Sequence, residues 1–192
     1  MKKNLFAVIC LLIALVMSCA SSGSSGNQRK FDSRIPQEIR NVVKNATENV
    51  LVGIGTARMA TLGQSRTISA ARARAEISRQ MDTIVRDMVR DYTAGSEVDH
   101  TAVVSFQENI TITLSQSRLQ GASILEEVED ERGNYWTVVS LSKTSTVNEI
   151  NQAVAAAKLR VPAMASFNAE TRMNDAFDKF VGTNQIGYSD RD

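Results

Sequence analysis

The spacing of hydrophobic residues changes from one stretch of the chain to the next, and each spacing predicts a different element. Residues 49–57 are aliphatic and β-branched, which predicts a buried strand. From residue 66 to residue 92 apolar positions recur every three or four residues, which predicts a long amphipathic helix ended by Gly95. We expect residues 61–65, between the two, to form a loop. The apolar face of the predicted helix consists of Ala70, Ala73, Ile77, Met81, Ile84, Val85, Met88 and Tyr92.

A β-hairpin is predicted later in the chain. Residues 119–129 and 135–142 flank residues 130–134, Asp-Glu-Arg-Gly-Asn, which is a turn-forming run. One face of the returning strand would carry Tyr135, Thr137, Val139 and Leu141.

Helices are expected around these strands. Pro36 begins a short helix that runs to about residue 45, because proline is tolerated in a first turn. Residues 147–160 are rich in alanine and predict a helix that Pro162 ends, and residues 167–180 predict a last amphipathic one.

Residues 101–118 carry two periodicities at once. Residues 110–114, Ile-Thr-Ile-Thr-Leu, alternate like a strand, whereas Val103, Phe106, Ile110 and Leu114 recur like one face of a helix; we favour the helix. The order of elements then predicts an α+β fold, with a small antiparallel sheet packed on the long helix and extra helices at the N- and C-terminal sides.

The N-terminus has the features of a secretory signal. Lys2 and Lys3 precede residues 5–17, a run of thirteen apolar residues that is too short to cross a bilayer comfortably. The run ends in Val16-Met17-Ser18-Cys19, which resembles the bacterial lipobox. That resemblance implies that Cys19 is acylated and becomes the first residue of the mature protein, since several acyl chains anchor a protein stably. The alternative is ordinary secretory cleavage nearby, with Cys19 incidental.

The residues after Cys19 predict a tether. Residues 20–28 are small and polar, and such a composition cannot bury enough apolar area to offset its chain entropy. Ala20 stands directly after Cys19, and by resemblance to the enterobacterial sorting rule this favours the outer membrane, with the periplasmic or surface side left open. Loss of residues 1–18 would change the net charge from +1 to −1 and remove Cys10.

Composition excludes several classes of function. The chain has 192 residues, a net charge of +1 and no basic block, so we expect no nucleic-acid partner. One His and two Cys cannot supply a zinc site of the usual four-ligand kind or a disulfide framework. We therefore expect no cofactor and no metal.

Candidate catalytic and binding motifs have simpler structural interpretations. Gly53-Ile54-Gly55 could begin a dinucleotide-binding turn, but Arg58 stands where the third glycine belongs, so close packing of strand on helix is favoured. His100 is expected to be a surface histidine in a loop. The acidic residues at 126–131 lack the spacing of a calcium loop and predict a solvated turn. We expect no catalytic residues and no enzyme activity.

One short motif suggests a different ligand. Residues 68–73, Ile-Ser-Ala-Ala-Arg-Ala, resemble the start of the binding helix in peptidoglycan-binding OmpA-like domains. By that resemblance Arg72 would hold the diaminopimelate group of the peptide, through charge pairing.

A longer resemblance covers most of the chain after the tether. Residues 52–57 (Val-Gly-Ile-Gly-Thr-Ala), 71–79 (Ala-Arg-Ala-Arg-Ala-Glu-Ile-Ser-Arg), 119–122 (Leu-Gln-Gly-Ala) and 133–139 (Gly-Asn-Tyr-Trp-Thr-Val-Val) come in one order. This resembles the Lpp-twenty family of bacterial outer-membrane lipoproteins, which is related to lipoproteins of flagellar basal discs. The resemblance implies a non-catalytic module for envelope assembly or surface exposure.

The expected organisation combines these features. Residues 1–18 are the signal peptide, 19–33 the lipidated Cys19 and tether, 34–143 the α+β lipoprotein domain and 144–192 a C-terminal helical extension. The expected partners are the membrane, through the lipid, and envelope or flagellar proteins. Association with a second copy of the chain is left open.

Overall fold

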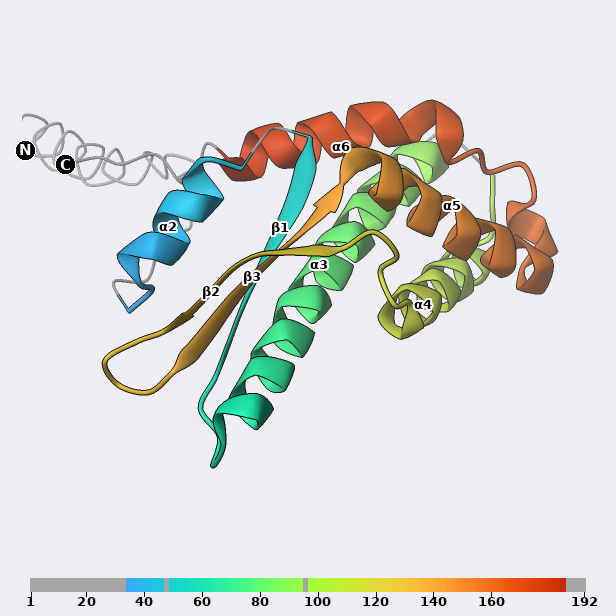
Figure 1. Ribbon diagram of the computed structural model, residues 1–192. Coiled ribbons are helices and arrows are strands. Elements are labelled where there is room, and N and C mark those ends of the chain that lie inside the picture. Colours follow the sequence, from blue (N-terminus) through green and yellow to red (C-terminus); the bar gives the residue numbers. More distant parts are fainter. Residues whose placement is uncertain (1–33, 47–48, 95–96, 186–192) are drawn as a thin grey trace, which may run out of the picture.

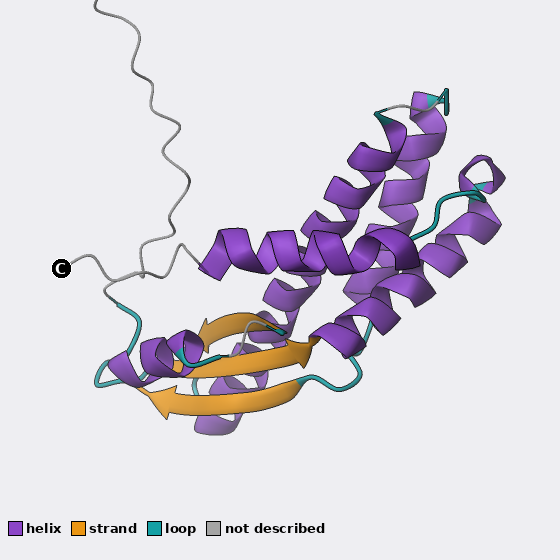
Figure 2. Cartoon of the chain, turned by 90° about the horizontal axis from the view of Figure 1, so that it is seen from above, coloured by secondary structure: helices purple, strands orange, loops and turns teal. Residues whose placement is uncertain are grey.

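The computed structural model describes residues 34–46, 49–94 and 97–185. The described residues form an α+β fold, as predicted, with helices on both faces of a small antiparallel sheet (Figures 1 and 2). The elements in chain order are α2 (Gln37–Lys44), β1 (Val50–Ala57), α3 (Leu62–Thr93), α4 (His100–Gln116), β2 (Ser123–Glu129), β3 (Tyr135–Ser142), α5 (Lys143–Arg160), the 3-10 helix η1 (Pro162–Met164) and α6 (Glu170–Gln185).

The sheet has the strand order β1-β3-β2, with β3 antiparallel to both neighbours. Alternation along β3 is as predicted: Thr137, Val139 and Leu141 face α3, while Trp136 and Val138 face α2. Figure 2 shows α2 and α3 on opposite sides of the strands. Ala57 pairs with Tyr135, so the connection from β1 to α3 and the hairpin turn lie at the same end of the sheet.

Two glycines set the distance between β1 and α3. A Cβ on Gly53 would stand 2.1 Å from the carbonyl oxygen of Ala73, and one on Gly55 would stand 1.9 Å from that of Ser69. No side chain fits in either place, so the strand backbone lies directly against the helix backbone. The packing interpretation of Gly53-Ile54-Gly55 is confirmed.

The main core lies on the α3 side of the sheet. It joins α3 and the sheet to α4, α5 and α6, so helices on both sides of residue 143 share one hydrophobic cluster. Residues 100–116 are helical, as favoured, and bury Phe106, Ile110 and Leu114 at intervals of four. The Phe106 and Phe167 rings meet edge to face, 5.4 Å between centroids, which fixes α4 against the turn before α6.

Several predicted boundaries were wrong. The last helix, expected at 167–180, is α6 at Glu170–Gln185, and a local hydrogen bond or backbone angle explains three other differences. Residues 62–65 belong to α3 rather than to a loop, because Thr61 Oγ1 accepts from Gln64 N (3.3 Å) and caps the helix. The helix α5 begins at Lys143 instead of residue 147, because Ser142 Oγ accepts from Ser145 N. The strand β2 begins at Ser123 rather than at Leu119, whose φ of 48° turns the chain. Gly95, the expected end of the long helix, lies outside the described residues.

The strand–helix contact gives a stability test. Gly55→Ala drives a Cβ into the Ser69 carbonyl and is expected to lower the free energy of unfolding by about 1–3 kcal/mol or more. Gly63→Ala is the matched control: its Cβ meets nothing within 4 Å, and alanine favours the helix by up to about 1 kcal/mol. Urea unfolding of residues 19–192 measures both. Equal stability of the two variants would contradict the backbone contact.

Candidate functional site

The most elaborate polar structure lies at the end of the sheet where the chain enters the fold. Here the start of α2, the end of β1 and the hairpin turn surround a hollow of about 690 Å³. Arg34, the first described residue, lines this hollow together with Thr56 and Trp136. The entering chain and the hairpin turn are therefore neighbours.

The hairpin turn is organised by Asp130. Its carboxylate accepts hydrogen bonds from the backbone N–H groups of Arg132 (2.9 Å) and Asn134 (2.8 Å), from Asn134 Nδ2 (2.9 Å) and from the Trp136 indole N–H (3.0 Å). Partial burial raises the pKa of Asp130, but the hydrogen bonds from Asn134, Trp136 and the backbone outweigh it and lower the pKa to about 2. The predicted turn is confirmed, but Asp130 is a hydrogen-bonded acceptor within it rather than a solvated side chain.

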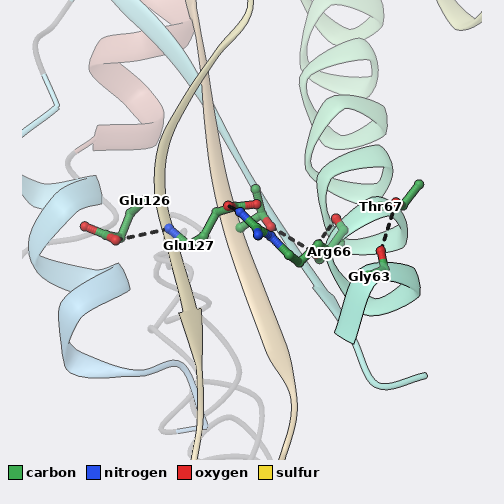
Figure 3. Close-up of polar contacts among 7 residues, drawn as sticks. Gly63, Arg66, Thr67, Glu126 and Glu127 are labelled. Atoms are coloured by element: carbon green, nitrogen blue, oxygen red, sulfur yellow. Dashed lines mark hydrogen bonds and ion pairs between the residues drawn. The ribbon is translucent and has the colours of Figure 1, made fainter. Parts of the chain in front are cut away.

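A second polar group joins α3 to the hairpin across the sheet. Arg66 Nη2 lies 2.5 Å from Glu127 Oε2 (Figure 3), and the Arg66 guanidinium lies over the Tyr135 ring, 5.7 Å from its centroid. The hydrogen bond and charge of Glu127 raise the pKa of Arg66, while burial and the Glu127 charge raise the pKa of Tyr135. Arg66 and Tyr135 are both protonated at neutral pH even without these shifts, so the group is an ion pair whose guanidinium lies over an aromatic ring.

The outer edge of β1 is covered by side chains of α3. Arg72 Nη1 donates to the Thr56 carbonyl, and Gln80 Nε2 donates to the Val52 carbonyl at 2.8 Å. Such contacts occupy carbonyl groups that an added strand would otherwise pair with. The structure therefore places Arg72, the candidate peptidoglycan ligand, on an exposed face of α3 where its guanidinium already binds the strand edge.

One buried carboxylate was missed in the sequence. Glu149 of α5 is 9% exposed and accepts hydrogen bonds from Ser117 Oγ and from Gln120 N (2.8 Å). It thereby holds the connection from α4 to β2, in which Leu119 has its positive φ. The sequence did carry a sign of this role, because Glu149 is the one charged residue on the buried face of α5, which is otherwise apolar except for Thr146. These hydrogen bonds satisfy the buried Glu149 carboxylate and give it a structural role.

A groove of about 720 Å³ separates α3 from α6. Met88, Ala176 and Phe180 supply its apolar lining, and uncharged polar side chains and charged side chains of both signs form the rest. The charged residues are Glu76, Arg79, Asp87, Asp91, Arg172, Asp175 and Lys179. Within this lining Arg79 is bound to Glu76 at 2.5 Å, and the Arg172 guanidinium lies over the Tyr92 ring.

The remaining predicted site residues fall in different places. Cys19 lies outside the described residues. His100 is exposed, as expected, but it begins α4 rather than lying in a loop, because Asp99 accepts from Ala102 N (3.1 Å) and caps that helix. Residues 34–46, 49–94 and 97–185 contain no cluster of His, Cys, Asp and Glu that could hold a metal ion. Among the same residues no helix is both long and apolar enough to span a bilayer.

No family model matches the chain, and no curated protein matches it.

The Asp130 turn predicts a pH dependence. A carboxyl whose pKa is lowered on folding adds stability above its ordinary pKa of 3.8, and this contribution is lost as the pH falls toward about 2. Asp130→Asn is therefore expected to be less stable than the unmodified chain at neutral pH, by on the order of 1 kcal/mol, with a gap that narrows between pH 4 and pH 2. Urea unfolding across this pH range measures the gap.

Glu131→Gln is the control for this experiment, because Glu131 is an exposed acid on the same turn. We expect this variant to follow the unmodified chain across the pH range. A gap between Asp130→Asn and the unmodified chain that stays constant down to pH 2 would contradict the assignment.

Proposed function

We propose that this chain is a lipid-anchored lipoprotein of the bacterial outer membrane, acting as a non-catalytic structural or protein-interaction module of the cell envelope. The observation that carries the proposal is the N-terminal sequence. A positive start, thirteen apolar residues at 5–17 and Val16-Met17-Ser18-Cys19 come in the order of a lipoprotein signal. The small polar residues at 20–28 then lead toward the described fold, which starts at Arg34.

The roles of the polar side chains support the non-catalytic part of the proposal. Asp130 closes the hairpin turn, Glu127 and Arg66 bind each other across the sheet, and Glu149 holds a connection. In the part of the chain that the structure describes, each of these strongly hydrogen-bonded groups has a partner that accounts for its position. A module of this kind works through its surface.

The resemblance to Lpp-twenty lipoproteins gains a physical meaning from the fold. Residues 52–57 form most of β1, and residues 71–79 lie in the part of α3 beside it. Gly53 of the first motif contacts Ala73 of the second, so the small residues in both allow one strand–helix contact. The motif at 133–139 supplies the end of the hairpin turn and much of β3, which pairs with β1. These three motifs mark the strand–helix framework, whereas residues 119–122 lie in the connection between α4 and β2. Association with flagellar or other envelope proteins is part of the proposal.

The lipid anchor has a direct test. Cys19→Ala is expected to abolish incorporation of labelled palmitate and to move the protein from the membrane fraction to the soluble fraction, because Cys19 is the acylated residue. Cys10→Ala, within the same apolar run, is the matched control and is expected to keep both label and membrane partition. A Cys19→Ala protein that stays labelled and membrane-bound would rule the proposal out.

Binding of peptidoglycan through Arg72 is the competing function. We expect residues 19–192 to remain in the supernatant when purified sacculi are sedimented, because the Arg72 guanidinium is used at the edge of β1. Co-sedimentation that Arg72→Ala abolishes, and that Arg74→Ala on the same helix leaves intact, would replace the proposed function with peptidoglycan binding.

A further inference from the structure

The connection between β1 and α3 exposes two large apolar side chains at one tip of the molecule. Met59 is 47% exposed and Leu62 is 53% exposed, and every residue from 58 to 64 is exposed. Figure 1 shows this connection as the lowest point of the fold, beyond the hairpin turn. Single exposed apolar residues are common on protein surfaces, but two of them three positions apart at a projecting tip form a distinct feature.

The tip is held in a fixed conformation by its own hydrogen bonds. Ser65 Oγ accepts from Met59 N at 2.9 Å, and Ser65 N donates to the Thr61 carbonyl at 3.0 Å. Thr61 Oγ1 also accepts from Gln64 N, which begins α3 immediately after the turn. Met59 and Leu62 are therefore presented on a defined turn at the start of a 32-residue helix.

The charged residues that lie near the tip in the sequence are all positive. Residues 49–75 contain four arginines and no acidic residue, and the arginines are Arg58, Arg66, Arg72 and Arg74. Arg58 lies toward the hairpin, its Nε 3.8 Å from the position of a Cβ on Gly133. In space this end also carries acidic side chains, because Arg66 is paired with Glu127 and Glu129 Oε1 lies beside Arg58 at Gly133, so an affinity for lipid would come from Met59 and Leu62 rather than from net charge.

The tip lies at the end of the fold where the chain enters. Arg34 lines the same hollow as Thr56, and Thr56 is three residues before Met59. Fifteen peptide steps separate Cys19 from Arg34, so an anchor on Cys19 keeps Arg34 within about 50 Å of the membrane even with the chain fully extended. Arg34 is the described residue nearest to such an anchor along the chain, and the tip lies at the same end of the fold.

We propose that Met59 and Leu62 insert into the lipid surface to which Cys19 is anchored, so that the tip is a second membrane contact and orients the module. The inference rests on the proposed lipid anchor. In this orientation the end of the sheet with the hairpin turn faces the membrane, and α4 and α5, which Figure 1 places farther from the tip, face away from it. The surfaces left for partner proteins are then those of the helical side.

The test places a tryptophan at the tip and asks whether lipid chains reach it. Residues 19–192 contain a single thiol, Cys19, so the chain can be coupled to a maleimide lipid in vesicles of phosphatidylethanolamine and phosphatidylglycerol. Leu62→Trp is compared with Leu159→Trp, a matched control on α5 that is 86% exposed. The unmodified chain gives the background of Trp136.

Brominated acyl chains are expected to quench the Leu62→Trp emission roughly twofold and the Leu159→Trp emission hardly at all, because interfacial side chains enter about 5–10 Å into the headgroup boundary. Equal quenching at both positions, or none at residue 62, would overturn the inference. Because the coupling is chemical, this result does not depend on lipidation in the cell. Failure of the palmitate test would refute the proposed anchor and with it the ground for the tip contact, whereas failure of the quenching test with palmitate labelling intact would refute the tip contact alone.

Discussion

The fold depends on the contact between the backbones of β1 and α3. Gly53 and Gly55 leave no side chain on the helix-facing side of the strand, and the carbonyl oxygens of Ala73 and Ser69 occupy the space. Close approach of this kind brings the polar side chains of α3 within reach of the sheet. Gln80 and Arg72 can then bind the edge of β1, and the Ser69 hydroxyl lies 2.7 Å from that of Thr137 in the buried interface. A larger residue at either glycine would push α3 away from the sheet. It would lengthen all of these hydrogen bonds at once, because each of them joins α3 to the sheet.

Both faces of the sheet are covered, one by a large hydrophobic cluster and the other by a small one. Its α3 face joins the core shared by α4, α5 and α6, whereas its other face is covered by a small cluster around Ile39 of α2, Trp136 and Val138. Trp136 belongs to both the small cluster and the Asp130 turn, since its indole N–H donates to that carboxylate. The entry of the chain, the hairpin turn and the exposed tip thus share one end of the molecule. The proposed second membrane contact rests on this arrangement.

Local patterns predicted the elements better than their ends. The apolar spacing of α3, the alternation of β3 and the small residues of β1 each follow from the burial of one face, so they are readable without a partner. The starts of α3 and α5 were placed too late because single hydroxyl caps, Thr61 and Ser142, decide them. The partners of the polar side chains were harder to predict than the elements. Arg66 and Glu127 are 61 residues apart, and only Glu149 gave a sign in the sequence, as an acid on an apolar helix face.

By itself the sequence determined the class of fold, because the order and spacing of neighbouring residues encode it, and the same kind of local order at residues 1–19 is the ground for the proposed membrane anchor. The two glycines of Gly53-Ile54-Gly55 also predicted close packing of β1 against a helix. The tertiary structure alone decided which distant polar side chains meet, and that Met59 and Leu62 project beside the entry of the chain. The hydrophobic periodicity of a sequence shows which residues are buried, but it does not show which residues they contact. A residue's neighbours in space depend on strand register and on the helix rotation that the glycine contact fixes.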